Sequence, residues 1–267
     1  ITSSASVSFA FSTAIASALM FVYYLITRWK ELGKVNGKEY IVKTIVTTEL
    51  IRTIAERNGV EIYDVYTGFK WIADVMKKNE GKKNYIGGGE ESYGFLCEDF
   101  VRDKDAVSAC AILAEIAAWA KDQGITMYQL LQNIYVQYGF SKEKGISVVK
   151  KGKSGAEEIE AMMKNFRENP LQEIAGSKVS LFYDYASLKG YSYIDNETIT
   201  LDMPTTSNVL QYFTEDNTKI SIRPSGTEPK IKFYCEVHSK VKSLEDLPEA
   251  NKAAEEKINQ IKASLGI

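Results

Sequence analysis

The sequence is poor in histidine and cysteine and has no marked excess of charge of either sign. His238 is the only histidine, which excludes a multi-histidine metal site and argues against a Ser-His-Asp triad. The three cysteines form no CxxC pair and leave an odd thiol under any disulfide scheme, so we expect a reducing, cytoplasmic location. The formal net charge of −2 gives no global electrostatic reason to expect nucleic-acid binding.

Charged residues are also missing from the first 27 positions, and Arg28 is the first charge. Such a stretch is long enough to cross a bilayer as a helix. Its first half is rich in serine and threonine, and no basic segment precedes the apolar run as it would in a secretory signal. We therefore expect a buried helix over about 18–32 after an irregular segment, with a membrane anchor through residues 5–27 as the alternative. Because the first residue is Ile rather than Met, we also expect a fragment or a processed product.

The length of 267 residues, with 45% hydrophobic and 25% charged residues, is typical of a globular protein of one to three domains. Strand and helix patterns alternate between residues 38 and 138, which indicates an α/β layer structure. Strands are predicted over 38–47, 60–65 and 84–86, and helices over 48–58, 69–78, 105–123 and 127–138. The polar segment 141–145 is the predicted boundary between domains 1–140 and 141–267.

The second half has a different pattern. Ser154 and Glu157 fit a capping box before a helix, and Pro170 should prevent that helix from continuing. Alternating apolar residues then predict strands around 179–183, 220–222 and 231–237, followed by a closing helix. The predicted fold is therefore an α/β domain with a mixed sheet, followed by a smaller α+β C-terminal domain. The apolar stripe of the closing helix consists of Ala254, Ile258, Ile261 and Leu265.

A glycine-rich segment, GGGEESYG at 87–94, is the first candidate site. Glycines allow positive φ values and a close approach of the backbone to a ligand. Glu90, Glu91 and Ser92 offer hydrogen bonds to the hydroxyls of a sugar or polyol, whereas two carboxylates would repel a phosphate. A solvated turn is the alternative interpretation.

A second candidate site is the segment RPSGTEPK at 223–230, which lies between two alternating strands. Arg223 provides a planar donor fork for phosphate oxygens, and Ser225 and Thr227 add hydroxyl donors. Gly226 permits a sharp loop whose backbone N–H groups converge on an anion. An ordinary hairpin turn with a surface arginine is the alternative.

Several smaller features have a structural and a functional interpretation. The segment 102–105 contains Lys104 and could place a cation beside an anion, or form a charged helix entrance. Thr67 and Gly68 could form a ligand-contacting turn or a helix cap. For His238 we expect a surface position, and for Cys235 a packing role.

Three motifs together resemble the α-D-phosphohexomutase family, and in particular its bacterial phosphoglucomutase/phosphomannomutase type. These motifs are GEES at 89–92, RDKDA at 102–106 and RPSGTEP at 223–229. The resemblance extends from about Ala18 to the C-terminus, while residues 1–17 depart from the family pattern. Members of this family have four domains, and this chain resembles the third and fourth only. The resemblance assigns sugar binding to Glu90, Ser92, Thr67 and Gly68, and phosphate binding to Arg223, Ser225, Gly226, Thr227 and Lys104.

The family reaction that the resemblance implies moves a phosphoryl group between the C1 and C6 oxygens of a hexose. An enzyme phosphoserine donates its group, glucose 1,6-bisphosphate or a similar bisphosphosugar forms, and Mg²⁺ assists. The phosphoserine loop (TASHNP type) and the magnesium loop (DGDxDR type) are both absent from this sequence. We therefore expect no catalytic residue, no metal ligand and no mutase activity in this chain alone, with the N-terminal domains of a longer parent as its partners.

Two alternatives stay open from the sequence. One is a mutase of other specificity, for mannose, glucosamine or pentose phosphate. The other is a non-catalytic module that binds sugar phosphates through the same two loops. The substrate in all these cases is a sugar phosphate, and we expect neither nucleic acid nor a membrane as a partner.

Overall fold

The computed structural model describes residues 4–150, 152–226 and 228–267. These residues form two compact units, which are described separately. The α/β unit comprises residues 10–141 and 240–247, and the β-rich unit comprises residues 142–239 and 248–267 together with 4–9. Neither unit is continuous in sequence, because each includes a short segment from elsewhere in the chain.

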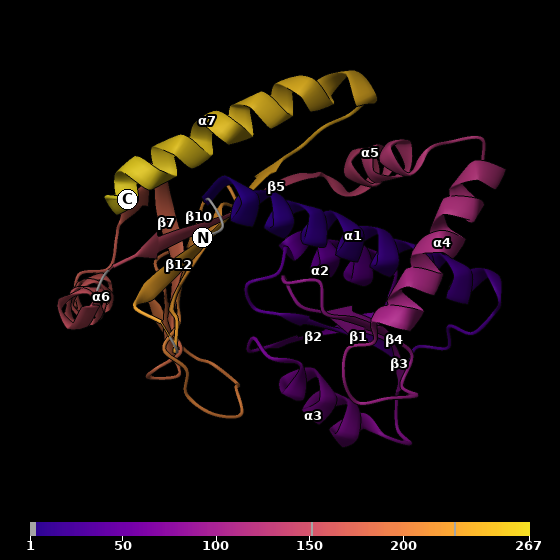
Figure 1. Cartoon of the computed structure of the whole chain (residues 1–267), viewed down its shortest axis with the longest axis horizontal. Coiled ribbons are helices and arrows are strands. Elements are labelled where there is room, and N and C mark those ends of the chain that lie inside the picture. Colours follow the sequence, from indigo (N-terminus) through magenta and orange to yellow (C-terminus); the bar gives the residue numbers. More distant parts are fainter. Residues whose placement is uncertain (1–3, 151, 227) are drawn as a thin grey trace. The chain divides into compact units, whose positions relative to one another are not determined.

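The α/β unit contains a four-stranded mixed sheet with helices on both sides. Its sheet has the strand order β2-β1-β3-β4, in which the first three strands are parallel and β4 is antiparallel to β3. Figure 1 shows α3 on one side of this sheet and α1 and α2 on the other. The elements up to its last helix are α1 (Ser4–Glu31), β1 (Glu39–Thr44), α2 (Glu49–Arg57), β2 (Glu61–Val65), α3 (Phe69–Asn79), β3 (Asn84–Gly89), β4 (Phe95–Cys97), α4 (Ala106–Asp122) and α5 (Met127–Tyr138).

Local signals account for the ends of these elements. The Thr48 side chain accepts a hydrogen bond from the Leu50 N–H and so caps α2. Gly59 and Gly124 follow α2 and α4 with φ values of 71° and 73°, which confirms both predicted helix ends. Below the sheet, α3 packs on a buried cluster consisting of Tyr40, Val42, Val65, Phe69, Ile72, Met76, Tyr85 and Leu96.

The first helix is longer than predicted. The segment before residue 18, which we expected to be irregular, is helical from Ser4. Over Phe11–Glu31 the helix is long and apolar enough to span a membrane, but 61% of its most apolar window is buried inside the structure. Ile15 and Leu19 are fully buried, and the Tyr24 hydroxyl donates to Glu115 of α4 at 2.6 Å. These contacts are those of a core helix.

The β-rich unit is built on an eight-stranded sheet. Its strand order is β5-β12-β11-β10-β7-β8-β9, with β6 paired to β7. The stripe predicted for the closing helix is buried in α7, and Figure 1 shows α6 and α7 next to the strands. The remaining elements are β5 (Phe140–Val149), α6 (Gly152–Glu168), β6 (Glu173–Ile174), β7 (Ser177–Asp184), β8 (Lys189–Ser192), β9 (Glu197–Thr200), β10 (Leu210–Thr214), β11 (Lys219–Pro224), β12 (Lys230–Ser239), η1 (Leu244–Asp246) and α7 (Leu247–Leu265).

Two details of the predicted elements were wrong. Segment 141–145 was not predicted to be a strand, but it is part of β5, and Ser141 and Glu143 are buried there. The two units nevertheless divide between Ser141 and Lys142, within the segment predicted as the domain boundary. Helix α6 begins at Gly152, two residues before the predicted cap Ser154, which is exposed on the helix. Strand β5 is held in the sheet by backbone pairing with β12, and the polar side chains of segment 141–145 do not predict this pairing.

Candidate functional site

The first candidate site lies at the carboxyl edge of the parallel strands. Because β1, β2 and β3 are parallel, the segments that follow them meet at one edge of the sheet, where α/β folds commonly bind ligands. After β3 the chain makes a tight hairpin turn over residues 90–94, which we call the β3–β4 turn. The Glu90 N–H donates to the Gly94 carbonyl at 2.7 Å and closes this turn.

Glu90 joins the β3–β4 turn to the segment that follows β2. The Gly68 N–H donates to Glu90 Oε1 at 2.7 Å, so two segments singled out separately in the sequence come together. Gly68 has a φ of 113°, which a residue with a side chain rarely adopts. Thr67 precedes it and is half-buried.

Ser92 and Lys104 are accessible beside this hydrogen bond. Ser92 is exposed at the tip of the turn, and the Lys104 side chain is 54% exposed. A Cβ at Gly94 would lie 2.8 Å from Glu90 Oε2 and 3.2 Å from Lys104 Cδ, so the two side chains flank Gly94 from different segments. The Glu90 carboxylate and the Lys104 side chain thus lie on either side of Gly94, and the exposed Ser92 belongs to the same turn. Lys104 also pairs with Asp103 at 3.3 Å. These residue types suit a ligand with hydroxyls and negative charge.

The segment 102–105 is the charged entrance of α4, one of the two roles considered for it. Asp105 accepts hydrogen bonds from the N–H groups of Val107 and Ser108 and caps α4, so the segment is a charged helix entrance. The hydrogen bonds from Ser108, followed by that from Val107, hold the pKa of Asp105 below its ordinary value. Capping by Asp105 fixes the start of the helix and thereby the backbone that carries Lys104.

The glycines that precede the turn do not adopt the positive φ values that the sequence analysis allowed for them. Gly87, Gly88 and Gly89 belong to strand β3, and none of the three has a positive φ. A Cβ at Gly88 would lie 2.3 Å from the Val42 carbonyl oxygen, which shows that these glycines allow β1 and β3 to pair closely.

The second candidate site is the turn between β11 and β12. The Ser225 N–H donates to the Lys230 carbonyl at 2.7 Å, and Arg223 is paired in register with Lys232. Gly226 is exposed, and its φ lies outside the left-handed region. Thr227, the fourth predicted phosphate ligand, lies outside the described residues.

The charges at this turn favour an anion. Arg223 is half-buried, and among the described residues no carboxylate forms an ion pair with its guanidinium. Glu228 pairs instead with Lys230 at 2.8 Å, and this hydrogen bond and charge lower the pKa of Glu228 below its ordinary value. The donor fork of Arg223 is therefore available to a ligand, as phosphate binding requires.

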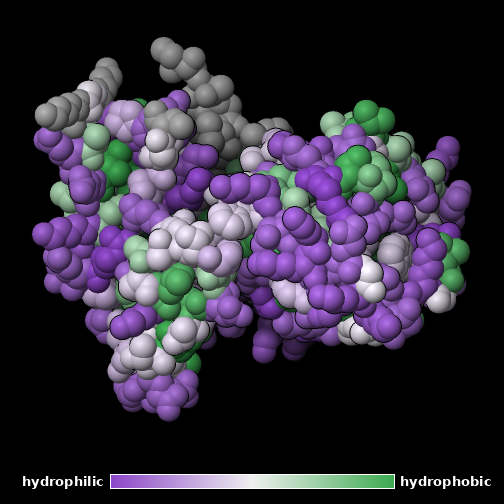
Figure 2. Space-filling view, turned by 90° about the horizontal axis from the view of Figure 1, so that it is seen from below, coloured by the Kyte–Doolittle hydropathy of each residue, from purple (hydrophilic) through white to green (hydrophobic). Residues whose placement is uncertain are grey.

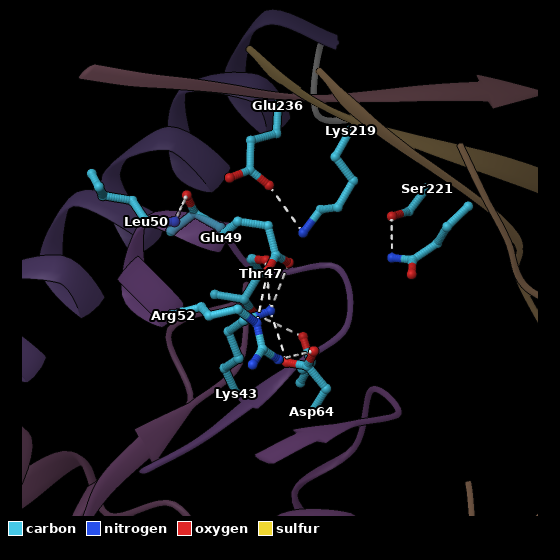
Figure 3. A network of polar contacts seen from close by, with 12 residues as sticks. Lys43, Thr47, Glu49, Leu50, Arg52, Asp64, Lys219, Ser221 and Glu236 are labelled. Carbon is cyan, nitrogen blue, oxygen red and sulfur yellow. Dashed lines mark hydrogen bonds and ion pairs between the residues drawn. The ribbon is translucent and has the colours of Figure 1, made fainter. Parts of the chain in front are cut away.

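Buried charges form two further clusters, which the sequence analysis did not predict (Figure 3). In the α/β unit, Lys43 is 1% exposed and pairs with Glu49 at 2.9 Å and Asp64 at 2.8 Å. In the β-rich unit, Lys219 and Glu236 pair at 3.0 Å and are 2% and 3% exposed. In the sequence, the only sign of either cluster is a charged residue among the apolar residues of a strand.

Comparison with known proteins identifies the family of both halves of the chain. The family described as "Phosphoglucomutase/phosphomannomutase, alpha/beta/alpha domain III" matches residues 19–138, and "Phosphoglucomutase/phosphomannomutase, C-terminal domain" matches residues 147–254. The chain belongs to the phosphoglucomutase/phosphomannomutase family. It corresponds to the C-terminal half of an α-D-phosphohexomutase, as the sequence motifs predicted.

Individual relatives of this phosphohexomutase chain are much longer than it is. A phosphoglucomutase of Staphylococcus aureus strain MRSA252 is 40% identical over 194 residues, which are 73% of this chain and 35% of the relative. The chain thus spans about a third of the length of the curated relatives that it matches.

Solved structures show the same fold. Parafusin (pp63) from Paramecium matches with a TM-score of 0.55 and 18% identity over 86% of this chain and 37% of its own. A phosphoglucomutase/phosphomannomutase family protein from Burkholderia thailandensis matches with a TM-score of 0.53 and 14% identity over 94% of this chain and 42% of its own. Both matches confirm the predicted succession of an α/β domain and a C-terminal α+β domain.

Among the residues that the structure describes, none form a site that fits the magnesium ion implied by the phosphohexomutase family. No group of three or more His, Cys, Asp or Glu residues could hold a metal ion within residues 4–150, 152–226 and 228–267. Asp103 and Asp105 flank Lys104 in sequence, and Asp105 is engaged in capping α4. Asp103 and Asp105 are therefore not assigned as metal ligands.

Sequence reasoning missed or misplaced two residues. Glu91 lies inside the GEES motif, yet it is buried and accepts a hydrogen bond from Thr44. His238, expected at the surface, is half-buried in β12 and pairs with Glu236 at 2.7 Å. Cys235 is buried as predicted, and burial raises the pKa of its thiol to about 12, which makes it an inert packing residue.

Proposed function

We propose that this chain is the sugar- and phosphate-holding part of a phosphohexomutase, which interconverts the 1-phosphate and the 6-phosphate of a hexose. The observation that carries this proposal is the hydrogen bond from the Gly68 N–H to Glu90, which unites two predicted sugar-binding segments beside the accessible Ser92 and Lys104. In the proposal, the β3–β4 turn binds sugar hydroxyls. The turn between β11 and β12, which carries Arg223, binds the phosphate that does not react.

The chemistry of transfer lies outside these residues. Phosphoryl transfer depends on positioning and on electrostatic stabilisation of the transferring oxygens. Glu90 and Ser92 contribute positioning through the sugar, and the Arg223 guanidinium contributes a charge-assisted grip on the distal phosphate. A phosphoserine and Mg²⁺ are supplied by loops that do not occur among the 267 residues, so the chain alone is proposed to be inactive. A phosphoglucomutase assay of the purified chain should detect no turnover.

Glucose phosphate is the favoured substrate, because the Staphylococcus aureus relatives that the chain matches are phosphoglucomutases. Mannose, glucosamine or pentose phosphates are the alternative substrates of the same site. A cytoplasmic location remains a prediction.

Binding measurements on two variants test the proposal. Arg223→Ala should weaken the binding of glucose 6-phosphate by about 1.5–3 kcal/mol, because a charge-assisted contact is lost. Glu90→Ala should weaken the same ligand but leave the affinity for inorganic phosphate nearly unchanged. Calorimetric or NMR titration of the two ligands separates the roles, and Lys252→Ala on the exposed face of α7 serves as a charge-matched control. Equal affinity of Arg223→Ala and wild type for glucose 6-phosphate would sink the assignment.

A further inference from the structure

Glu91 is a buried carboxylate in the middle of an otherwise accessible turn. Glu91 is only 7% exposed, whereas the two residues that follow it, Ser92 and Tyr93, are exposed. Taking a carboxylate out of water costs several kcal/mol unless hydrogen bonds or charges compensate. A glutamate that merely decorated a surface turn would stay in solvent.

The burial of Glu91 connects the β3–β4 turn to the end of strand β1. The Thr44 hydroxyl donates to Glu91 Oε2 at 3.0 Å, and Thr44 Oγ1 lies 2.8 Å from Thr47 Oγ1. Thr44 is the last residue of β1, and Thr47 follows it in the turn before α2. Because a hydroxyl has one proton, a Thr44 that donates to Glu91 accepts from Thr47, and the three groups form one polarised chain.

The turn that carries these threonines is itself fixed by charge. Lys43 is fully buried, its ammonium lies 3.5 Å from the Thr47 carbonyl oxygen, and it forms ion pairs with Glu49 and Asp64 (Figure 3). Arg52 also pairs with Glu49 and with Asp64, which ties α2 and β2 to the same cluster. These buried ion pairs therefore fix the backbone that carries the Thr44 and Thr47 hydroxyls.

The β3–β4 turn has a conformation that needs such support. Tyr93 has a φ of 64°, in the left-handed region, which is an unfavourable conformation for a residue with a side chain. Such a conformation persists only where the surroundings hold it. Two hydrogen bonds hold the residues around Tyr93. One is the backbone bond from the Glu90 N–H to the Gly94 carbonyl, and the other is the bond from the Thr44 hydroxyl to Glu91.

We infer that Glu91 is a positioning residue, which anchors the β3–β4 turn to Thr44 so that Glu90 and Ser92 are presented to the sugar. This inference deepens the proposed function and rests on it. Glu91 does not touch the ligand in this role. It acts through the backbone, because its two chain neighbours are the residues proposed to bind.

Three variants of the full chain separate positioning from simple loss of a buried group. Glu91→Ala removes the acceptor, and we expect glucose 6-phosphate to bind about ten-fold more weakly. Glu91→Gln keeps a carbonyl oxygen for the Thr44 hydroxyl, and we expect affinity within about two-fold of wild type. Glu256→Ala changes an exposed glutamate of α7 and should leave the affinity unchanged.

Amide hydrogen exchange of residues 88–97 provides the readout that does not depend on a ligand. Glu91→Ala should exchange faster in this segment and at the wild-type rate in α7, while Glu91→Gln should match wild type throughout. Wild-type affinity and exchange in Glu91→Ala would overturn the inference. So would equal losses of affinity in the alanine and glutamine variants, because the carboxylate would then act through its charge.

The same experiment distinguishes failure of the inference from failure of the proposed function. If the wild-type chain binds none of the hexose phosphates, the proposed function fails. The exchange comparison still decides whether Glu91 anchors the turn: faster exchange in Glu91→Ala supports the anchor, and unchanged exchange overturns it.

Discussion

At the scale of single residues, Gly88 shows how a glycine can be required by packing rather than by a ligand. A Cβ at this position would lie 2.3 Å from the Val42 carbonyl oxygen and 2.8 Å from the Tyr85 hydroxyl. The first of these atoms is backbone of the paired strand β1 and cannot move without disturbing the sheet. The glycine run of β3 thus brings β1 and β3 together directly before the β3–β4 turn.

Gly88→Ala should lower the free energy of unfolding by about 1–3 kcal/mol or more, because β1 and β3 must move apart. Gly226→Ala is the matched control, since a Cβ there would meet nothing within 4 Å, and its unfolding free energy should change little. Urea denaturation of both variants measures the difference. Equal stability of the two variants would contradict the packing role of Gly88.

His238 is the second residue whose surroundings make a prediction. Burial lowers its pKa, but the charge and hydrogen bond of Glu236 outweigh burial, and the net pKa lies above the ordinary value. Glu143 raises the pKa further and Lys219 opposes this. The folded state therefore binds the proton of His238 more tightly than the unfolded state does.

A raised folded pKa means that the stabilisation by His238 is full below the unfolded pKa of about 6.5 and is lost as the pH rises through the folded pKa. The difference in unfolding free energy between wild type and His238→Gln should accordingly be largest at acidic pH and shrink as the pH rises. Denaturation at several pH values between about 5.5 and 8.5 tests this. A difference that grows with pH would show that the pKa is lowered instead.

At the scale of elements, β11 and β12 are joined by a buried ion pair as well as by their backbone hydrogen bonds. Lys219 and Glu236 are directly opposite in register. Both faces of β12 are buried at this point, because Glu236 and Tyr234 are covered as well as the predicted apolar set. Removal of one ion from such a pair leaves the other uncompensated.

Lys219→Met should reduce the unfolding free energy by about 3 kcal/mol, and the further change of Glu236→Leu should cost less in this background than alone. Lys252→Met, at an exposed position of α7, is the control and should stay within about 0.5 kcal/mol of wild type. Thermal or urea unfolding of the full cycle measures the coupling. Strict additivity of the two substitutions would indicate that the pair contributes nothing as a pair.

Elements with local signals were predictable from the sequence. Helix α2 follows from the cap Thr48, the apolar spacing of Leu50, Ile51 and Ile54, and Gly59 at its end. Strand β5 was missed because its neighbouring strand in the sheet is β12, which lies far along the chain. Ser141, at the start of β5, is buried beside the Thr48 hydroxyl, a contact that is also distant in sequence. Lys43 was missed for the same reason, since its two carboxylate partners are contributed by α2 and β2.

At the scale of the whole molecule, charged and apolar groups are distributed as expected for a globular protein. Figure 2 shows a mostly hydrophilic face with separate hydrophobic areas. The two candidate turns were identified from residue types and spacing alone, and the structure brings Glu90, Gly68 and Lys104 to one edge of a sheet. Glu91 could not be assigned from the sequence, because the position of Thr44 beneath it is set by strand order.

One titration tests the central claim that this chain holds both the sugar and the phosphate of a hexose phosphate. The isotopically labelled full chain is titrated with glucose 6-phosphate and, separately, with inorganic phosphate, while backbone amide resonances are followed. The account predicts saturable shifts for residues 88–94 and 223–226 with glucose 6-phosphate, and shifts confined to 223–226 with inorganic phosphate. Saturable shifts that bypass both turns, or no shift at millimolar glucose 6-phosphate, would contradict it.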